Sequence, residues 1–353
     1  MSQSKLRSFL VPILSVIFGL VLGAIVMLIF GFDPIKGYDA MLKGALGRPF
    51  FIGETLRQAT PLILVGLGFS VAYKAGFFNI GVAGQALFGW FFSVWTALLF
   101  PDLPRFLLLP LCLIVGALGG ALWAGIAGYL RAYFNTSEVI VTIMLNYTAL
   151  SVVNYLIREV LTEKADATAK ISENATLRAT WLTQLTQNST LHLGIFVAIA
   201  AVIFVWVLMN KTIVGFELKT VGLNKFAAEY AGMSAKKNII LAMLISGALA
   251  GLGGAMEGLG TFQNIFTFSA LPDIGFDGLA VSLLGSGNPF GIVFSALIFG
   301  ILRIGGNSMP LVAQVPKEVV SIVMASIIFF VGASYIITYL FDKFHFTKKE
   351  KVN

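Results

Sequence analysis

The chain has 353 residues, of which 58% are hydrophobic and 12% are charged, whereas soluble domains carry about 25% charged residues. This composition excludes a soluble globular protein and predicts an all-α, multi-pass protein of the cell membrane. The net charge is +7, but the cations gather at the ends of apolar runs, so we attribute them to topology and contact with the lipid bilayer, not to nucleic acid. The one cysteine excludes a disulfide framework and a cysteine-based metal site.

Apolar segments long enough to cross roughly 30 Å of hydrocarbon follow one another along the chain. They predict about ten transmembrane helices in a single transmembrane domain over residues 1–353. The expected spans are 9–30, 56–73, 80–100, 106–130, 138–158, 191–210, 239–260, 274–287, 289–308 and 318–341. The eighth and ninth are glycine-rich and are separated by the turn sequence Gly285-Ser-Gly-Asn-Pro289, so one of them is a candidate for a broken or re-entrant helix.

The charges between the spans predict which side of the membrane each loop occupies. An even number of spans that starts in the cytoplasm places both termini there. The same topology puts Lys74, Arg131, the 211–238 loop and the basic tail 343–351 on the cytoplasmic side. Residues 159–190 are polar and rich in Thr, Asn and Gln. They are predicted to form the largest extracellular loop and a partly ordered cap.

The segment from Thr220 to Lys237 is an amphipathic, positively charged insert between two strongly apolar spans. If it is helical, it runs for about five turns. Because the rest of the chain is apolar, as in a membrane protein, such a segment is expected to dock on a partner.

Small residues recur every four positions in the fourth and seventh predicted spans. They are Gly116, Gly120, Ala124 and Gly128 in the fourth, and Gly247, Gly251 and Ala255 in the seventh. Because small residues let helix backbones approach closely, the spacing predicts close contacts along both stripes and places both helices inside the bundle. It fits plain tight packing, the commoner case, as well as a sliding surface.

The motifs of nucleotide-binding and catalytic proteins are missing. No Gly-Lys dipeptide occurs, so the chain has no P-loop. With His192 and His345 as the only histidines, it has no histidine-based metal or nucleophile arrangement. We therefore expect a protein that is not an enzyme, holds no cofactor or metal, and passes a solute across the bilayer.

Polar side chains inside apolar spans are costly in lipid and usually face a cavity or another helix. The candidates to line a solute path are Asn79, Gln85, Asn146, Glu257, Gln263 and Asn264. Amides suit an uncharged solute with hydroxyl or ring-nitrogen groups, although a hydrogen bond between helices is the commoner role for each one alone. Glu257 is also a candidate to pair with Arg303 or to hold a loop. Phe262, Phe266 and Phe268 offer faces for stacking a planar base or sugar ring.

Two stretches resemble a known family. The sequence from Ala75 to Gln85, Ala-Gly-Phe-Phe-Asn-Ile-Gly-Val-Ala-Gly-Gln, is similar to the signature of inner-membrane permeases of ATP-binding-cassette (ABC) importers that handle ribose, branched-chain amino acids and nucleosides. The stretch 221–233, followed by 246–254, resembles the cytoplasmic coupling loop of these permeases and the helix behind it. The segments 33–38 and 53–61 are closest to the nucleoside-importer subgroup.

The resemblance implies a type II ABC-importer-like permease that takes up nucleosides and performs no chemistry itself. ATP would be bound by a partner, expected to be a two-cassette ATP-binding subunit. The other implied partners are a second, related permease and an extracytoplasmic solute-binding lipoprotein.

In this family the coupling loop lies as a short helix in a groove of the ATPase. The resemblance assigns coupling to Gly222, Asn224, Ala227, Ala228, Glu229, Tyr230 and Gly232. The alanines provide close-packing positions and Tyr230 an aromatic anchor, so Ala228, Tyr230 and Gly232 are expected at the contact face. Gly222 and Gly232 are expected at turns, and Asn224 as a helix cap.

Three alternatives are open at this point. A permease of the same family could carry ribose or another simple sugar, because a pentose fits the same amides. An ion-coupled secondary transporter would use Glu257 as its coupling carboxylate and the glycine-rich region 274–306 as its broken helices. A membrane scaffold or enzyme is the third alternative, and the missing histidine, cysteine and nucleotide motifs count against the enzyme.

Overall fold

The computed structural model of the protein describes residues 3–332. The regular elements among these residues are helices, accompanied by one isolated β-bridge, which confirms the predicted all-α class. The end of the last predicted span, from residue 333, and the basic tail 343–351 lie outside the described residues.

The helices vary from a single turn to the length of a membrane span. In chain order they are α1 (Gln3–Ile29), α2 (Pro34–Leu46), α3 (Pro49–Lys74), α4 (Val82–Leu99), α5 (Arg105–Phe134), α6 (Glu138–Leu156), α7 (Thr180–Leu185), α8 (Gly194–Lys211), α9 (Ile213–Leu223), α10 (Lys225–Tyr230), α11 (Ala235–Met256), α12 (Ile274–Leu284), α13 (Pro289–Gly306), α14 (Met309–Val312) and α15 (Lys317–Gly332). Two π-helical turns, η1 (Ile157–Leu161) and η2 (Glu257–Thr261), continue α6 and α11 at their ends.

Seven of the described helical stretches are long and apolar enough to cross a membrane. They are Pro49–Lys74, Val82–Leu99, Arg105–Phe134, Glu138–Leu161, Gly194–Lys211, Ala235–Thr261 and Pro289–Val312. Two shorter apolar helices, Ile13–Ile29 and Ile274–Leu284, also fall on predicted spans. Every predicted span overlaps a helix, but length and composition support seven spans, so the count of ten stays a prediction.

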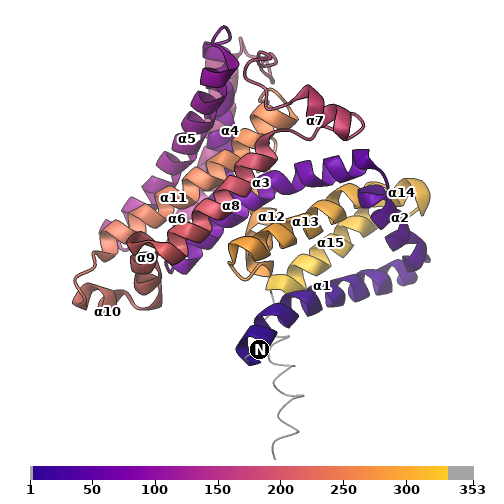
Figure 1. Ribbon diagram of the computed structural model, residues 1–353, viewed down its shortest axis with the longest axis horizontal. Helices are drawn as coiled ribbons and strands as arrows, with labels where there is room; N and C mark the ends of the chain where they lie inside the picture. Colours follow the sequence, from indigo (N-terminus) through magenta and orange to yellow (C-terminus); the bar gives the residue numbers. More distant parts are fainter. Residues whose placement is uncertain (1–2, 333–353) are drawn as a thin grey trace, which may run out of the picture.

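Helix α3 joins two groups of helices. On one side it packs against α11 and α8, and α11 in turn packs against α4 and α5. On the other side it packs against α12 and α13, beside which the paired helices α1 and α15 lie (Figure 1). Most of α3 is therefore buried, whereas α5 and α6 expose most of their surface.

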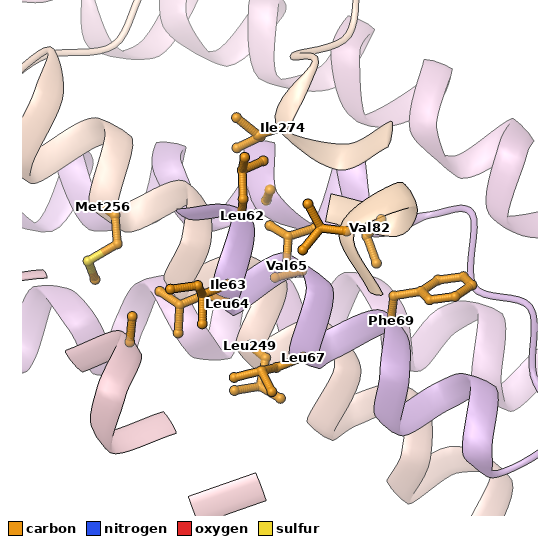
Figure 2. Close-up of a cluster of buried hydrophobic side chains, with 14 of the residues drawn as sticks. Leu62, Ile63, Leu64, Val65, Leu67, Phe69, Val82, Leu249, Met256 and Ile274 are labelled. Carbon is orange, nitrogen blue, oxygen red and sulfur yellow. The ribbon is translucent and has the colours of Figure 1, made fainter. Parts of the chain in front are cut away.

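The core of the bundle follows α3. Figure 2 shows Leu62, Leu64 and Leu67 of this helix pointing to different sides, toward Ile274 of α12 and Leu249 of α11 among others. Successive helical residues are rotated by about 100°, so a helix that is apolar on all sides can be buried on all sides. These leucines are fully buried, which fixes α3 as the central helix.

The predicted small-residue stripes form a close contact between helices. At Gly120 of α5 and Gly247 of α11 the backbones meet, and a Cβ on either residue would overlap the carbonyl oxygen of the other. A Cβ on Gly251 would overlap the carbonyl oxygen of Gly116 of α5, and a Cβ on Gly89 of α4 would overlap that of Gly251. The predicted close contact is confirmed. However, only α11 lies inside the bundle, because α5 exposes its opposite face to the surroundings.

The turn sequence before Pro289 separates two helices of unequal length. Ser286 (φ 51°) and Gly287 (φ 62°) take left-handed backbone conformations, and the Asn288 side chain caps α13 by accepting hydrogen bonds from the N–H groups of Phe290 and Gly291. The 11 residues of α12 extend about 16 Å, too short to cross a bilayer. This helix is largely buried between α3, α4 and α13, where lipid does not reach its ends.

We predict that Gly120→Ala lowers the free energy of unfolding by about 1–3 kcal/mol, because the added methyl group has no space beside Gly247. Thermal unfolding in detergent measures the effect. Gly125→Ala is the matched control on the same helix, since its Cβ would meet only the end of the Leu244 side chain. Equal melting temperatures for the two variants would contradict the assigned contact.

Candidate functional site

The insert between α8 and α11 forms two helices, α9 and α10, and not one continuous helix. The break lies at Asn224 (φ −159°, ψ 104°), whose Oδ1 accepts hydrogen bonds from the N–H groups of Phe226 (3.0 Å) and Ala227 (3.1 Å). An asparagine side chain satisfies the free N–H groups at a helix start, so it begins α10 here. The predicted cap is confirmed.

The two glycines of the insert have different roles. Gly232 (φ +84°) takes the left-handed conformation just after α10, as expected for a turn. Gly222 lies inside α9, where a Cβ would overlap the carbonyl oxygen of Lys74, so the prediction of a turn at Gly222 is wrong. This glycine instead allows α9 to approach the end of α3.

The inner face of α10 is fixed against its own chain. Ala228 is 0% exposed and packs in a small apolar cluster with Val221 of α9 and Ala235 of α11. The structure therefore corrects its expected place at the contact face, because a partner cannot reach it. The outer face carries Ala227, Glu229 and Tyr230, of which Tyr230 is 99% exposed.

Further apolar side chains extend this surface. Leu223, Phe226 and Phe216 are also exposed on α9 and α10. Exposed large apolar groups clustered on a short segment are typical of a protein docking surface.

Three of the predicted path residues form hydrogen bonds within the chain. Asn79 and Gln85 form a reciprocal amide pair, with N–O distances of 3.0 and 3.1 Å, and Asn79 Nδ2 also donates to Ser246 Oγ on α11 (2.9 Å). Asn146 of α6 accepts from the Gly84 N–H (2.8 Å) and donates to the Ile80 carbonyl (2.9 Å).

All three amide side chains are buried and hydrogen-bonded within the chain. The segment 75–85 enters the apolar bundle with irregular backbone before α4 begins, and unpaired backbone groups are expensive there. These amides supply the missing hydrogen bonds. Their arrangement is that of structural residues that fix this segment to α6 and α11.

Glu257 does not pair with Arg303, so that expectation is wrong. Arg303 instead binds Asp277 (2.6 Å) and Asp273 (3.0 Å), which join α12 to α13. Glu257 is buried at the start of η2, where its side chain bonds Thr261 and lies within electrostatic range of Arg57.

An outer charge cluster surrounds η2, formed by Glu54, Arg57, Arg178 and Glu257. Arg57 Nε donates to Glu54 (2.9 Å), whose carboxylate also accepts from the N–H of Thr190 in the 159–190 segment (2.6 Å). The cluster contains two cations and two carboxylates, so its formal charge is balanced. It connects the start of α3 to the polar segment.

The 159–190 segment is held on η2 by hydrogen bonds. The end of a helix leaves its last carbonyl groups without partners in the helix, and Arg178 donates to those of Gly260 (3.0 Å) and Thr261 (2.7 Å) at the end of η2. Gln263 Nε2 donates to Thr176 Oγ1 (2.7 Å). Gln263 therefore ties this cap down and is not free for a solute.

His192 lies buried under the same cap. Its Nδ1 accepts a hydrogen bond from the Gly194 N–H (3.1 Å). The ring therefore fixes the start of α8.

Four rings form an outer aromatic cluster: Trp90, Phe262, Phe266 and Phe268. Phe262 stacks on Trp90 with ring centroids 5.2 Å apart and planes inclined by 20°. Trp90 Nε1 donates to the Asn264 carbonyl (2.8 Å), which fixes the indole, and Phe262 is 45% exposed. The stack thus has one immobilised ring and one accessible ring.

Asn264 is the predicted path residue that keeps its side chain available. It is half-buried beside the cluster, and its amide group makes no hydrogen bond with the part of the chain that the structure describes. Sequence reasoning missed Trp90 and the residues Glu54, Arg57 and Arg178. Two signals were present in the sequence. Glu54 and Arg57 are opposite charges three residues apart near the start of a predicted span, and Trp90 places an indole inside another span.

Residues 51–332 match the family described as branched-chain amino acid transport system / permease component. The chain belongs to this permease family. It is therefore a transport subunit of a multi-pass membrane transporter and not an enzyme, as predicted.

Relatives match the permease over nearly its full length. The guanosine ABC transporter permease protein NupP of Bacillus subtilis (strain 168) is 50% identical, over 96% of this chain and 97% of its own. The nucleoside ABC transporter permease protein NupB of Lactococcus lactis subsp. cremoris is 48% identical, over 97% and 95%. The glucose ABC transporter permease protein TsgB13 of Haloferax volcanii is 35% identical, over 92% and 87%. No solved structure matches the chain.

We predict that Asn146→Ala lowers the free energy of unfolding by about 1–3 kcal/mol, because it leaves the Gly84 N–H and the Ile80 carbonyl unpaired in the bundle. Thermal unfolding and solute uptake measure the two consequences separately, and KM is expected to stay unchanged. Asn210→Ala, at an exposed asparagine of α8, is the control. A raised KM with unchanged stability would instead place Asn146 on the solute path.

Proposed function

We propose that this permease is the membrane-spanning subunit of an ABC importer that takes up nucleosides. The observation that carries the proposal is the identity of about half of all residues, over nearly the whole of both chains, to permeases named for guanosine and nucleoside transport. The resemblance of segments 33–38 and 53–61 to the nucleoside subgroup supports it from the sequence alone.

The proposal includes three partners. ATP is bound and hydrolysed by a separate, two-cassette subunit, because this chain has no P-loop. A second, related permease completes the membrane pathway, and an extracytoplasmic lipoprotein delivers the solute. The permease itself requires no cofactor.

We assign the ATPase contact to the outer face of α9 and α10 within the 211–238 loop. Support comes from the exposed Tyr230 and Phe226 and from the rigid inner face at Ala228. Gly222, Asn224 and Gly232 shape the segment, and Gly232 is exposed together with Ala227 and Glu229.

The proposed topology has ten spans, both termini in the cytoplasm and residues 159–190 outside. Figure 1 shows α10 and α7 at opposite ends of the bundle, as a loop docking inside and a cap outside require. Because α12 alone is too short to cross, this topology requires the remaining residues of its predicted span, 285–287, to complete the crossing.

We propose that the solute contacts the outer aromatic cluster, with a nucleobase on the exposed face of Phe262 and hydrogen bonds to Asn264. A base has a flat π-face and polar edges, which match an exposed ring beside an unpaired amide. Asn79, Gln85 and Asn146 are assigned structural roles.

A sugar is the second candidate solute. The relative TsgB13, named for glucose, is 35% identical, and sugars also stack on aromatic rings. The ion-coupled alternative loses its basis, because Glu257 is held inside the outer charge cluster and the chain belongs to a family of transport-system permease components.

We predict that Tyr230→Ala lowers ATP-driven uptake by about tenfold or more, because an exposed aromatic anchor at a docking surface contributes strongly to binding. Uptake and ATP hydrolysis by the reconstituted complex are the measurements. Tyr147→Ala, at an exposed tyrosine of α6, is the control and is expected to transport normally. Normal uptake by the Tyr230 variant would remove this surface from the coupling contact.

We predict that Phe262→Leu raises the KM for guanosine about tenfold, since the loss of stacking costs about 1–3 kcal/mol per base. Competition of labelled guanosine uptake by unlabelled nucleosides, glucose and ribose identifies the solute class in the same assay. Phe276→Leu, at an exposed phenylalanine of α12, serves as control. Competition by sugars alone would overturn the nucleoside assignment.

A further inference from the structure

A cavity of about 620 Å³ lies where the end of α3, the start of α6 and the end of α9 meet. It is separate from the outer aromatic cluster, and of the apolar side chains on the exposed face of α9 and α10 it includes only Leu223. Its wall includes Lys74, Lys219, Tyr73, Phe78, Leu223 and Glu138. Under the proposed topology, on which this inference rests, the cavity faces the cytoplasm at the membrane surface.

The cavity is positively charged. Lys74 makes no ion pair or hydrogen bond with any residue that the structure describes, and Lys219 donates only to the neutral Asn210 Oδ1 (3.2 Å). The single carboxylate in the wall, Glu138, is engaged by Arg131 (3.3 Å). Two ammonium groups near enough to repel each other therefore face one cavity, and neither is paired with a carboxylate.

The other walls are aromatic and aliphatic. Tyr73 stacks on Phe69 (ring centroids 5.7 Å apart, 16°), and Phe78 meets both rings edge-on. Tyr73 keeps about half of its surface exposed, and Leu223 lies opposite on α9. An occupant thus meets two cations and an apolar surface in the same cavity.

We propose that this cavity binds a phosphate-bearing ligand, with its phosphate between Lys74 and Lys219 and its apolar part against Tyr73 and Phe78. Lysine ammonium groups bind phosphate as point charges, and a second cation favours a multiply charged anion. Both an anionic phospholipid headgroup and a free nucleoside monophosphate have this chemistry.

A ligand bound in this cavity would restrain the position of α9 in the coupling segment. Gly222 of α9 packs directly on the Lys74 carbonyl and on Gly76, so α9 and the cavity wall share a backbone contact. A ligand that bridges Lys74 and Lys219 ties α9 to α3. The expected consequence is a change in the rate at which the ATPase drives transport.

The test uses the complete transporter in lipid nanodiscs. In one arm, discs of phosphatidylcholine alone are titrated with labelled uridine 5′-monophosphate while a non-hydrolysable ATP analogue occupies the ATPase. In the other arm, native mass spectrometry counts phosphatidylglycerol retained from mixed discs. We expect the double variant Lys74→Gln/Lys219→Gln to weaken binding about tenfold in the arm that shows binding.

The control is Lys211→Gln/Lys237→Gln, which removes the same charge from exposed lysines outside the cavity and is expected to bind normally. Equal binding by both double variants, or no binding in either arm, overturns the inference. If the first double variant is not recovered folded, Lys219→Gln and Tyr73→Leu carry the same test. Nucleoside uptake by the unmodified transporter is measured in parallel, so a failure of the proposed function is distinguished from a failure of this site.

Discussion

The close backbone contact of α11 with α4 and α5 is the constraint on which the other features depend. Lipid provides no hydrophobic force between helices, so packing and hydrogen bonds must hold them together. Gly247 and Gly251 permit that packing on two sides of α11. The helix begins beside the docking segment at Ala235 and continues into η2 under the outer cap. A rigid α11 therefore links the two ends of the bundle, where coupling and solute entry are proposed.

Polar residues in the bundle divide into two groups by their partners. The amides of Asn79, Gln85 and Asn146 replace the hydrogen bonds that irregular backbone lacks between α3 and α4. The outer charge cluster does the same for the carbonyls released by η2, through Arg178. Both groups stabilise departures from regular helix in a medium without water. Of the residues predicted from the sequence, Asn264 alone keeps an amide beside an accessible ring.

Much of the architecture could be predicted because its causes are local. Span positions follow from apolar runs, the break before Pro289 follows from Ser, Gly and Asn in a turn, and the start of α10 follows from the Asn224 cap. The start of α2 has a similar signal, which the sequence analysis did not use. Asp33 caps this helix by accepting a hydrogen bond from the Ile35 N–H, and Pro34 occupies the first helical position.

By itself the sequence determined the helical class, the permease family, the absence of a P-loop and the small-residue stripes, since each depends on residue types at fixed spacing. Only the tertiary structure decided which partner each polar side chain takes. The sequence is compatible with an ion pair of Arg303 with either Glu257 or the aspartates at α12. It is equally compatible with Ala228 facing a partner protein or facing its own chain. Such choices depend on which helices become neighbours, and neighbours far apart in the chain are set by packing of the whole bundle.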